Sequence, residues 1–306
     1  MKRPYVWLLV VAVLIGLPSL APSQRPAPRL PEGTKAYRDL EYVKGGHERN
    51  KLDLYVPEKS PGPLPVIVWI HGGAWLSGDK NNPPALLFVT RGYAVASINY
   101  RLSQHAKWPA QIEDCKAAIR WLRANATKYH LDSEHIGVWG ASAGGHLVAL
   151  LGTAGDVKEL EGKGGNTEQS SRVQAVIDWF GPSDFMTIAG QAPPDSRIDH
   201  AAADSPEAKL LGGRIQDNKD KAAKASPVAY VNKKAAPFLI IHGNKDNVVP
   251  YAQSVELAEA LKKAGVEVTL KKIEGAGHGG PQFNSAENRK LIVDFFDKHL
   301  KNVKKG

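Results

Sequence analysis

The feature that most constrains this 306-residue chain is a Gly-x-Ser-x-Gly spacing at Gly140, Ser142 and Gly144. The apolar run 135–139 before it is typical of a short buried strand, and residues 145–151 after it have the composition of a helix start. A strand joined to a helix by so tight a turn is a nucleophile elbow, in which a strained serine exposes its hydroxyl above a sheet. Because this spacing also occurs by chance, the prediction that Ser142 is a nucleophile depends on this context and on its partners.

Apolar runs and helical spacing alternate along the remainder of the chain. Apolar runs predict buried strands at 65–70, 93–100, 173–180, 237–242 and 266–273, and helical spacing predicts helices at 84–90, 110–130, 251–264 and 284–300. Segments 37–42 and 51–56 alternate apolar and polar residues, as an edge hairpin does. The prediction is an α/β fold with a mostly parallel central sheet and helices on both faces, whose reactive groups lie on loops at the carboxyl ends of the strands.

A nucleophilic serine needs a base to take its proton and an acid to orient that base. His278 is the expected base, because the glycine-rich loop after the last predicted strand can carry an imidazole over the sheet. Two carboxylates follow core strands, Asp246 and Asp184. We favour Asp246 as the acid, since Asp184 is expected to cap a helix instead. The order Ser142, Asp246, His278 is that of nucleophile, acid and base in α/β hydrolases.

The stretch His71-Gly-Gly-Ala-Trp75 follows the predicted strand 65–70 and can direct several backbone amides at one point. We predict that the N–H groups of Gly73, Ala74 and Ala143 form an oxyanion hole, with His71 as a structural anchor of the loop. Trp75 is either a wall of the acyl pocket or a packing residue, and the sequence does not separate these alternatives. Phe180 is a second candidate for the pocket wall.

The N-terminus has the features of a secretory signal peptide over residues 1–23. Lys2 and Arg3 precede an apolar run, Val6–Leu17, that is too short to span a bilayer comfortably, and small residues follow it. An uncleaved anchor is the alternative. We expect export to the periplasm or the medium, with no stable membrane span after cleavage.

The domain organisation follows from shifts in composition. A Pro-rich leader is predicted at 24–36 and a catalytic domain at 37–303. The segment 182–236 interrupts the alternation and is rich in Ala, Lys, Gly and Pro, which predicts a cap inserted over the site.

Composition argues against several other functions. The net charge is +9, but the lysines are scattered and lack interleaved aromatic residues, so we expect no nucleic-acid partner. The single cysteine, Cys115, is expected to be a buried thiol. No metal is expected, because no group of His, Cys and acidic residues has a typical ligand spacing. No cofactor is expected either, because the Gly-x-Gly-x-x-Gly at 275–280 is not followed by a βαβ unit. The oligomeric state is not predicted.

Several segments together resemble the α/β-hydrolase esterases near hormone-sensitive lipase, and within them the bifunctional feruloyl and acetyl-xylan esterases (BD-FAE-like). The segments are His71–Trp75, Asn99–Ser103, Gly140–Gly145, Trp179–Phe185, Leu210–Gly213, Ala225–Val228, His242–Pro250 and Gly275–Gly279. One departure is Ala74, which stands where the lipases usually have a third glycine; this weakens the lipase assignment but not the catalytic one.

The resemblance covers roughly residues 37–300 and implies hydrolysis of carboxylic esters through an acyl-enzyme, on small-molecule or polysaccharide acetyl or feruloyl esters. Two alternatives remain open. One is amide hydrolysis on the same fold, by an arylformamidase or a serine peptidase. The other is a catalytically inactive hydrolase fold that serves as a binding module.

Overall fold

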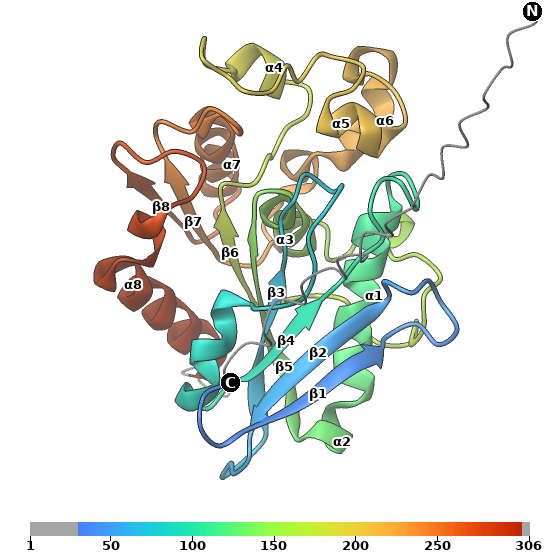
Figure 1. Cartoon of the computed structure of the whole chain (residues 1–306), viewed down its shortest axis with the longest axis vertical. Coiled ribbons are helices and arrows are strands. Elements are labelled where there is room, and N and C mark those ends of the chain that lie inside the picture. The colour runs from blue at the N-terminus through green and yellow to red at the C-terminus, as the bar shows by residue number, and fades with distance from the viewer. Residues whose placement is uncertain (1–29, 302–306) are drawn as a thin grey trace, which may run out of the picture.

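The computed structural model describes residues 30–301, which form one eight-stranded sheet in the order β1-β2-β4-β3-β5-β6-β7-β8 (Figure 1). The strands are β1 (Thr34–Glu41), β2 (Lys51–Pro57), β3 (Leu64–Ile70), β4 (Ala94–Ile98), β5 (Leu131–Ala141), β6 (Ala175–Trp179), β7 (Phe238–Gly243) and β8 (Val268–Ile273). Strand β2 pairs antiparallel with β1 and β4, and the other pairings are parallel. The predicted mostly parallel sheet is confirmed. The predicted leader is too long, since β1 already begins at Thr34.

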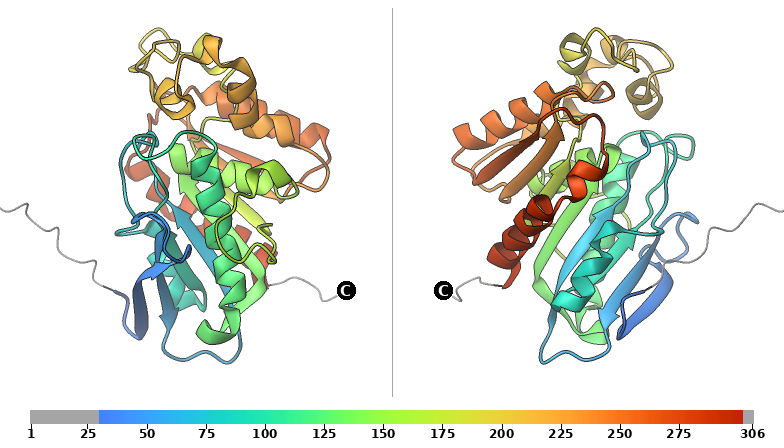
Figure 2. Two further views of the ribbon diagram at one scale, coloured as in Figure 1. Left: turned by 90° about the vertical axis from the view of Figure 1, so that its right-hand side faces the viewer. Right: turned by 60° about the vertical axis from the view of Figure 1, so that its left-hand side comes forward.

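Helices cover both faces of the sheet (Figure 2). The longer helices are α1 (Ala110–Ala124), α3 (Ala143–Thr153), α7 (Tyr251–Lys263) and α8 (Ala286–Phe296). Successive residues of β3 enter two separate apolar clusters: Val68 packs in the cluster that contains residues of α1, α3 and α7, and Ile67 in the one that contains α8. Because both faces are buried, the strand reads as a continuous apolar run in the sequence. Cys115 of α1 is buried as predicted, and burial raises the pKa of its thiol.

Three predicted helices differ in detail from the structure. The helix predicted at 110–130 is divided into α1 and the short α2 (Ala126–Tyr129) at Asn125, whose side-chain amide donates to the Trp121 carbonyl. The first segment predicted as helical, 84–90, is a 3₁₀ helix at Pro84–Arg91. Helix α8 begins after Ser285, whose hydroxyl accepts from the Asn288 amide, and a π turn over 297–301 follows it.

The segment between β6 and β7 contains only helical elements and turns, and it lies beyond the carboxyl ends of the strands (Figures 1 and 2). Its α-helices are α4 (Ile188–Gln191), α5 (Pro206–Leu211) and α6 (Lys219–Ala225), with 3₁₀ turns at Ile215–Asp217 and Pro227–Tyr230. We call residues 182–236 the cap segment.

Within residues 30–301, no helix is long and apolar enough to cross a membrane. The predicted signal peptide, residues 1–23, lies outside the described residues.

Candidate active site

Ser142 occupies the turn between β5 and α3 in a strained conformation, with φ 57° and ψ −120°. Its amide donates to the Trp179 carbonyl at 2.8 Å. A Cβ added at Gly140 would overlap the Gly144 carbonyl, and a Cβ added at Gly144 would overlap the Ile70 carbonyl. These two positions therefore require glycine, because strand and helix backbones touch there.

His278 joins the Ser142 hydroxyl to a carboxylate. Its Nε2 lies 2.9 Å from Ser142 Oγ, and its Nδ1 lies 2.6 Å from Asp246 Oδ2. Because an ionised carboxylate only accepts, Nδ1 carries the proton and Nε2 is left to accept the serine hydroxyl. The three side chains come from the loops after β5, β7 and β8, and the structure brings them into one hydrogen-bonded chain.

The Asp246 carboxylate is held by four hydrogen bonds. Oδ1 accepts the amides of Val248 and Val249 at 2.8 and 2.9 Å, and Oδ2 accepts from His278 and, at 3.1 Å, from His242 Nε2. Burial by itself raises the pKa of Asp246, but the hydrogen bonds and charges of the two imidazoles outweigh it and hold the pKa well below its usual range. Asp246 is therefore ionised at neutral pH.

His242 is a site residue that the sequence analysis missed. It stands near the end of β7, is fully buried, and its Nδ1 lies 2.6 Å from the Ser254 hydroxyl, which donates to it. Burial lowers the pKa of His242, so the ring is neutral and donates to Asp246 from Nε2. Its position four residues before the predicted acid is the only sequence signal for this role.

The alternative acid, Asp184, lies in a different environment. Its Oδ1 accepts the Met186 amide at 2.7 Å, and its hydrogen-bond partners do not include His278. The prediction that Asp184 caps a helix is wrong. The residue that precedes α4 is Thr187, and the Asp184 side chain instead accepts the Met186 amide in the turn before the helix.

The loop after β3 holds its backbone in an unusual conformation. Gly73, Ala74 and Trp75 have φ values of 108°, 56° and 57°. The backbones of Ala74 and Trp75 therefore lie in the left-handed region that favours glycine. The amides of Gly73, Ala74 and Ala143 donate no hydrogen bond to any other backbone group of residues 30–301. Ala74 and Ala143 line a cavity beside Ser142, whereas Gly73 does not. The amides of Ala74 and Ala143 are thus free to bind an anionic oxygen at the serine.

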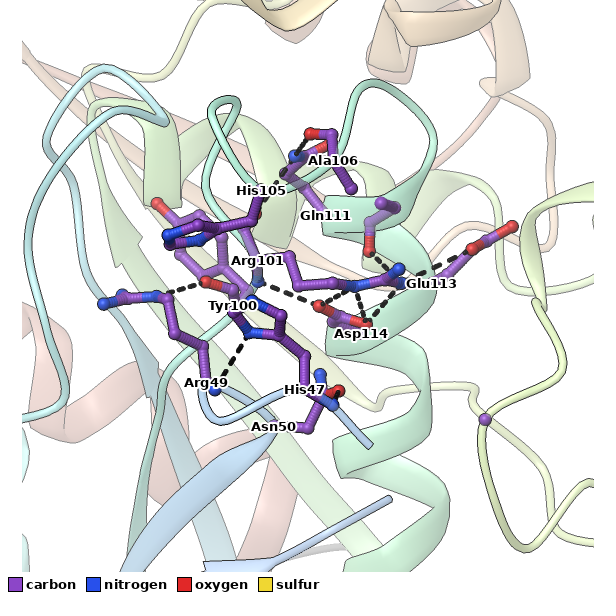
Figure 3. Close-up of polar contacts among 12 residues, drawn as sticks. His47, Arg49, Asn50, Tyr100, Arg101, His105, Ala106, Gln111, Glu113 and Asp114 are labelled. Atoms are coloured by element: carbon purple, nitrogen blue, oxygen red, sulfur yellow. Dashed lines mark hydrogen bonds and ion pairs between the residues drawn. The ribbon is translucent and has the colours of Figure 1, made fainter. Parts of the chain in front are cut away.

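Arg49 connects the loop after β3 to the loop after β4. It donates to His71 Nε2 at 3.2 Å, to the Gly78 carbonyl at 2.9 Å and to the Tyr100 carbonyl at 2.7 Å, the last of which is drawn in Figure 3. His71 donates from Nδ1 to the Gly72 carbonyl and stacks on Tyr100 with ring centres 4.4 Å apart. Burial lowers the pKa of His71 to about 4. A neutral, fully engaged ring is what a loop anchor requires.

The loop after β4 is fixed in turn to α1. Arg101 forms a two-pronged pair with Asp114, with contacts of 2.8 and 2.9 Å, and Gln111 donates to the carbonyls of Arg101 and Ala106 (Figure 3). The loops that surround the serine are thus braced by polar contacts, most of them partly buried.

Trp75 both packs and lines the cavity. Its indole N–H donates to His146 Nδ1 at 3.2 Å, and its ring contributes to a cavity of about 30 Å³ beside Ser142. Phe180 does not line this cavity. Its ring lies 4.5 Å from that of His278, so it supports the imidazole rather than forming the predicted pocket wall.

The cap segment supplies much of the cavity wall. Its contributions are Pro182, Ile198, His200, Pro206 and Glu207. Their spacing matches no motif, so the sequence analysis did not single out any of them.

One cluster of possible metal ligands lies on the surface, where His47, Glu48 and His105 place ligand atoms within 4.8 Å of one another. Figure 3 shows both rings. Nδ1 of His47 accepts the Arg49 amide at 3.1 Å, and Nδ1 of His105 accepts the Leu102 amide at 3.2 Å. A neutral imidazole that accepts at Nδ1 carries its proton on Nε2. Both rings therefore offer N–H groups in this conformation, not the free lone pairs that bind a metal.

Comparisons with known proteins identify the family and the relatives of this chain. Residues 52–261 match the family model BD-FAE. Esterase LipQ of Mycobacterium tuberculosis is 34% identical over 78% of this chain, which spans 56% of the length of that protein. A truncated carbohydrate esterase from gut microbiota is 36% identical, with a TM-score of 0.82 over 89% of this chain and 99% of its own. An acetyl ester-xyloside bifunctional hydrolase from Caldicellulosiruptor lactoaceticus is 28% identical, with a TM-score of 0.67 over 81% of this chain and 87% of its own.

Proposed function

Because this chain belongs to the BD-FAE family and has the α/β-hydrolase fold, we propose that it is a serine-dependent carboxylic ester hydrolase. The observation that carries the proposal is the hydrogen-bonded chain from Ser142 through His278 to Asp246, beside amides that are free to bind an oxyanion.

The geometry gives each residue a role in acyl transfer. Ser142 Oγ attacks the ester carbonyl carbon while its proton passes to His278 Nε2, and Asp246 stabilises the imidazolium. The C–O bond to the alcohol then breaks, His278 returns the proton to the departing oxygen, and the acyl group remains on Ser142. A water molecule, deprotonated by His278, then attacks the acyl carbon; the bond to Ser142 Oγ breaks, His278 returns the proton to Oγ, and the acid is released.

The amides of Ala74 and Ala143 stabilise the tetrahedral intermediate, with Gly73 as the third predicted donor. Loss of one such donor costs on the order of 3 kcal/mol in other enzymes. The anchoring of His71 by Arg49 keeps the loop in place before substrate arrives, so little reorganisation is needed during the reaction.

Within the acyl groups that the sequence suggested, we favour acetyl over feruloyl. The cavity beside Ser142 measures about 30 Å³, close to the space of one or two waters. This suits an acetyl methyl group, whereas an aromatic acyl group needs a larger space. Two structural relatives act, by their descriptions, on carbohydrate or acetyl esters. These points support acetylated carbohydrate as the substrate class. We also propose that the protein meets this substrate after export directed by its N-terminal segment.

The serine's role is tested by replacement of Ser142 with Ala. We expect kcat on p-nitrophenyl acetate to fall about 10⁶-fold, because the residues of a triad act as a unit. Ser133→Ala is the control, since its hydroxyl contacts only Glu134 near the start of β5. Undiminished turnover by the Ser142 variant contradicts the proposal.

The substrate class is tested by acetate release from acetylated xylan, with p-nitrophenyl acetate and methyl ferulate in parallel. We expect acetate release to be faster than ferulate release. If the protein hydrolyses p-nitrophenyl acetate alone, it is a general carboxylesterase and the proposed carbohydrate substrate is wrong.

A further inference from the structure

The cap segment places a buried imidazole–carboxylate pair in the wall of the cavity that contains Ser142. His200 Nδ1 lies 3.0 Å from Glu207 Oε1, and the two side chains are 1% and 3% exposed. Both line the same cavity as Ser142 and Trp75. The esterase mechanism described above uses neither residue.

Each member of this pair keeps one polar atom without a partner. His200 Nε2 and Glu207 Oε2 are buried and make no hydrogen bond within residues 30–301. A buried polar atom without a partner is costly, and most native structures avoid it. A pair that served only to hold the cap in place would need the Nδ1–Oε1 contact alone, so the two free atoms call for a further partner.

The chemistry of the free atoms defines that partner. Because the carboxylate accepts, His200 Nδ1 carries a proton, and in the neutral ring Nε2 is an acceptor, as is Glu207 Oε2. A hydroxyl group satisfies either atom by donating to it. An alkyl or aromatic group satisfies neither.

We propose that His200 and Glu207 form a subsite for a hydroxyl group on the carbon next to the ester, in the alcohol portion of the substrate. This inference rests on the proposed ester hydrolysis at Ser142. The cavity admits two groups of about the size of a water molecule, so an acetyl methyl group and a hydroxyl bound at the pair both lie beside the reacting carbonyl. The remaining cap residues in the wall, Pro182, Ile198 and Pro206, have apolar side chains, so the pair is the cap's polar contribution. It selects vicinal hydroxy esters over plain alkyl esters.

The test uses two esters that differ by one hydroxyl, 1,2-cyclohexanediol monoacetate and cyclohexyl acetate. In the unaltered protein, kcat/KM for the diol monoacetate should exceed that for cyclohexyl acetate by about 10- to 100-fold, the range for a hydrogen bond to a charged group. The double variant His200→Phe/Glu207→Leu replaces both partners by apolar groups, so that neither is left buried alone. It should reduce this ratio to within about threefold while cyclohexyl acetate is still hydrolysed.

The control is His135→Gln. His135 makes a similar contact, 2.7 Å from Asp132, near the start of β5 and away from the cavity. It should leave the ratio unchanged.

Equal hydrolysis of both esters by the unaltered protein overturns the subsite, and this result does not require any variant to fold. A double variant that slows both esters equally also overturns it, since the pair is then structural. If the unaltered protein hydrolyses neither ester nor p-nitrophenyl acetate, the proposed function itself fails.

Discussion

The carboxylate of Asp246 accepts hydrogen bonds from two imidazoles on a single oxygen, and only one of these imidazoles reaches Ser142. His242 is enclosed and neutral, so it orients the carboxylate, whereas the partly exposed His278 is free to exchange a proton with substrate. The two rings differ in role because they differ in burial and in their second partner.

Asp246 and Asp184 both follow core strands, and their replacement separates their roles. Asp246→Asn should lower kcat on p-nitrophenyl acetate by about 10⁴-fold, because an amide no longer fixes the tautomer of His278. Asp184→Asn should stay within about threefold of the unaltered protein, since an amide oxygen still accepts the Met186 amide. Steady-state kinetics on the three proteins checks this, and the reverse ranking would make Asp184 the acid.

At the residue scale, the sequence predicts those site residues that stand in a recognisable motif. Ser142 and His278 stand out by their flanking glycines and by the strands before them. His200 and Glu207 do not, because their proximity to Ser142 depends on how the cap folds back over the sheet. Phe180 is a related case, because the sequence does not show that its ring lies against that of His278, with ring centres 4.5 Å apart.

At the scale of elements, the elbow depends on contact between two backbones. Gly144→Ala should lower the free energy of unfolding by 3 kcal/mol or more, roughly the upper range for overpacking, because the new Cβ overlaps the Ile70 carbonyl. Gly190→Ala is the matched control, since nothing lies within 4 Å of a Cβ there. It should be neutral or stabilising by up to about 1 kcal/mol, as expected for alanine in a helix. Urea denaturation of both variants gives the comparison, and a Gly144 variant as stable as the Gly190 variant would contradict this account of the elbow.

Strands were predicted well because each buried strand is a continuous apolar run. Helix ends were predicted less well. The break at Asn125 arises from a side chain that bonds to the backbone one turn earlier, which periodicity does not register. The loop after β3 was predicted from its glycines, but the positive φ of Ala74 and Trp75 has no sequence signal, since neither residue is of a type that favours this region.

At the scale of the whole molecule, two buried neutral histidines make stability depend on pH. Burial lowers the pKa of both His71 and His146 to about 4, against an ordinary value of 6.5. Between pH 6.5 and 4 the unfolded chain binds protons that the folded chain does not, so stability falls as the pH falls through this window. Above pH 6.5 these two groups contribute no pH dependence.

His146→Gln tests this linkage. Glutamine retains a donor and an acceptor for the Ala225 carbonyl and the Trp75 indole but does not titrate. The difference in unfolding free energy between the unaltered protein and the variant should shift in favour of the variant by about 3 kcal/mol from pH 7 to pH 4. Urea denaturation at pH 7, 5.5 and 4 measures this shift, and a constant difference across the three pH values would rule out a neutral buried His146.

The arrangement of the cap segment has a consequence for how such a protein diversifies. The residues proposed for chemistry come from loops after β3, β5, β7 and β8, spread along much of the chain. The residues proposed to select the alcohol come from one uninterrupted stretch between β6 and β7. A single exchange of that stretch between relatives would transplant a new preference and leave the reaction centre untouched. Because one continuous segment carries the preference for the alcohol, recombination as well as stepwise substitution can generate new substrate preferences on this fold.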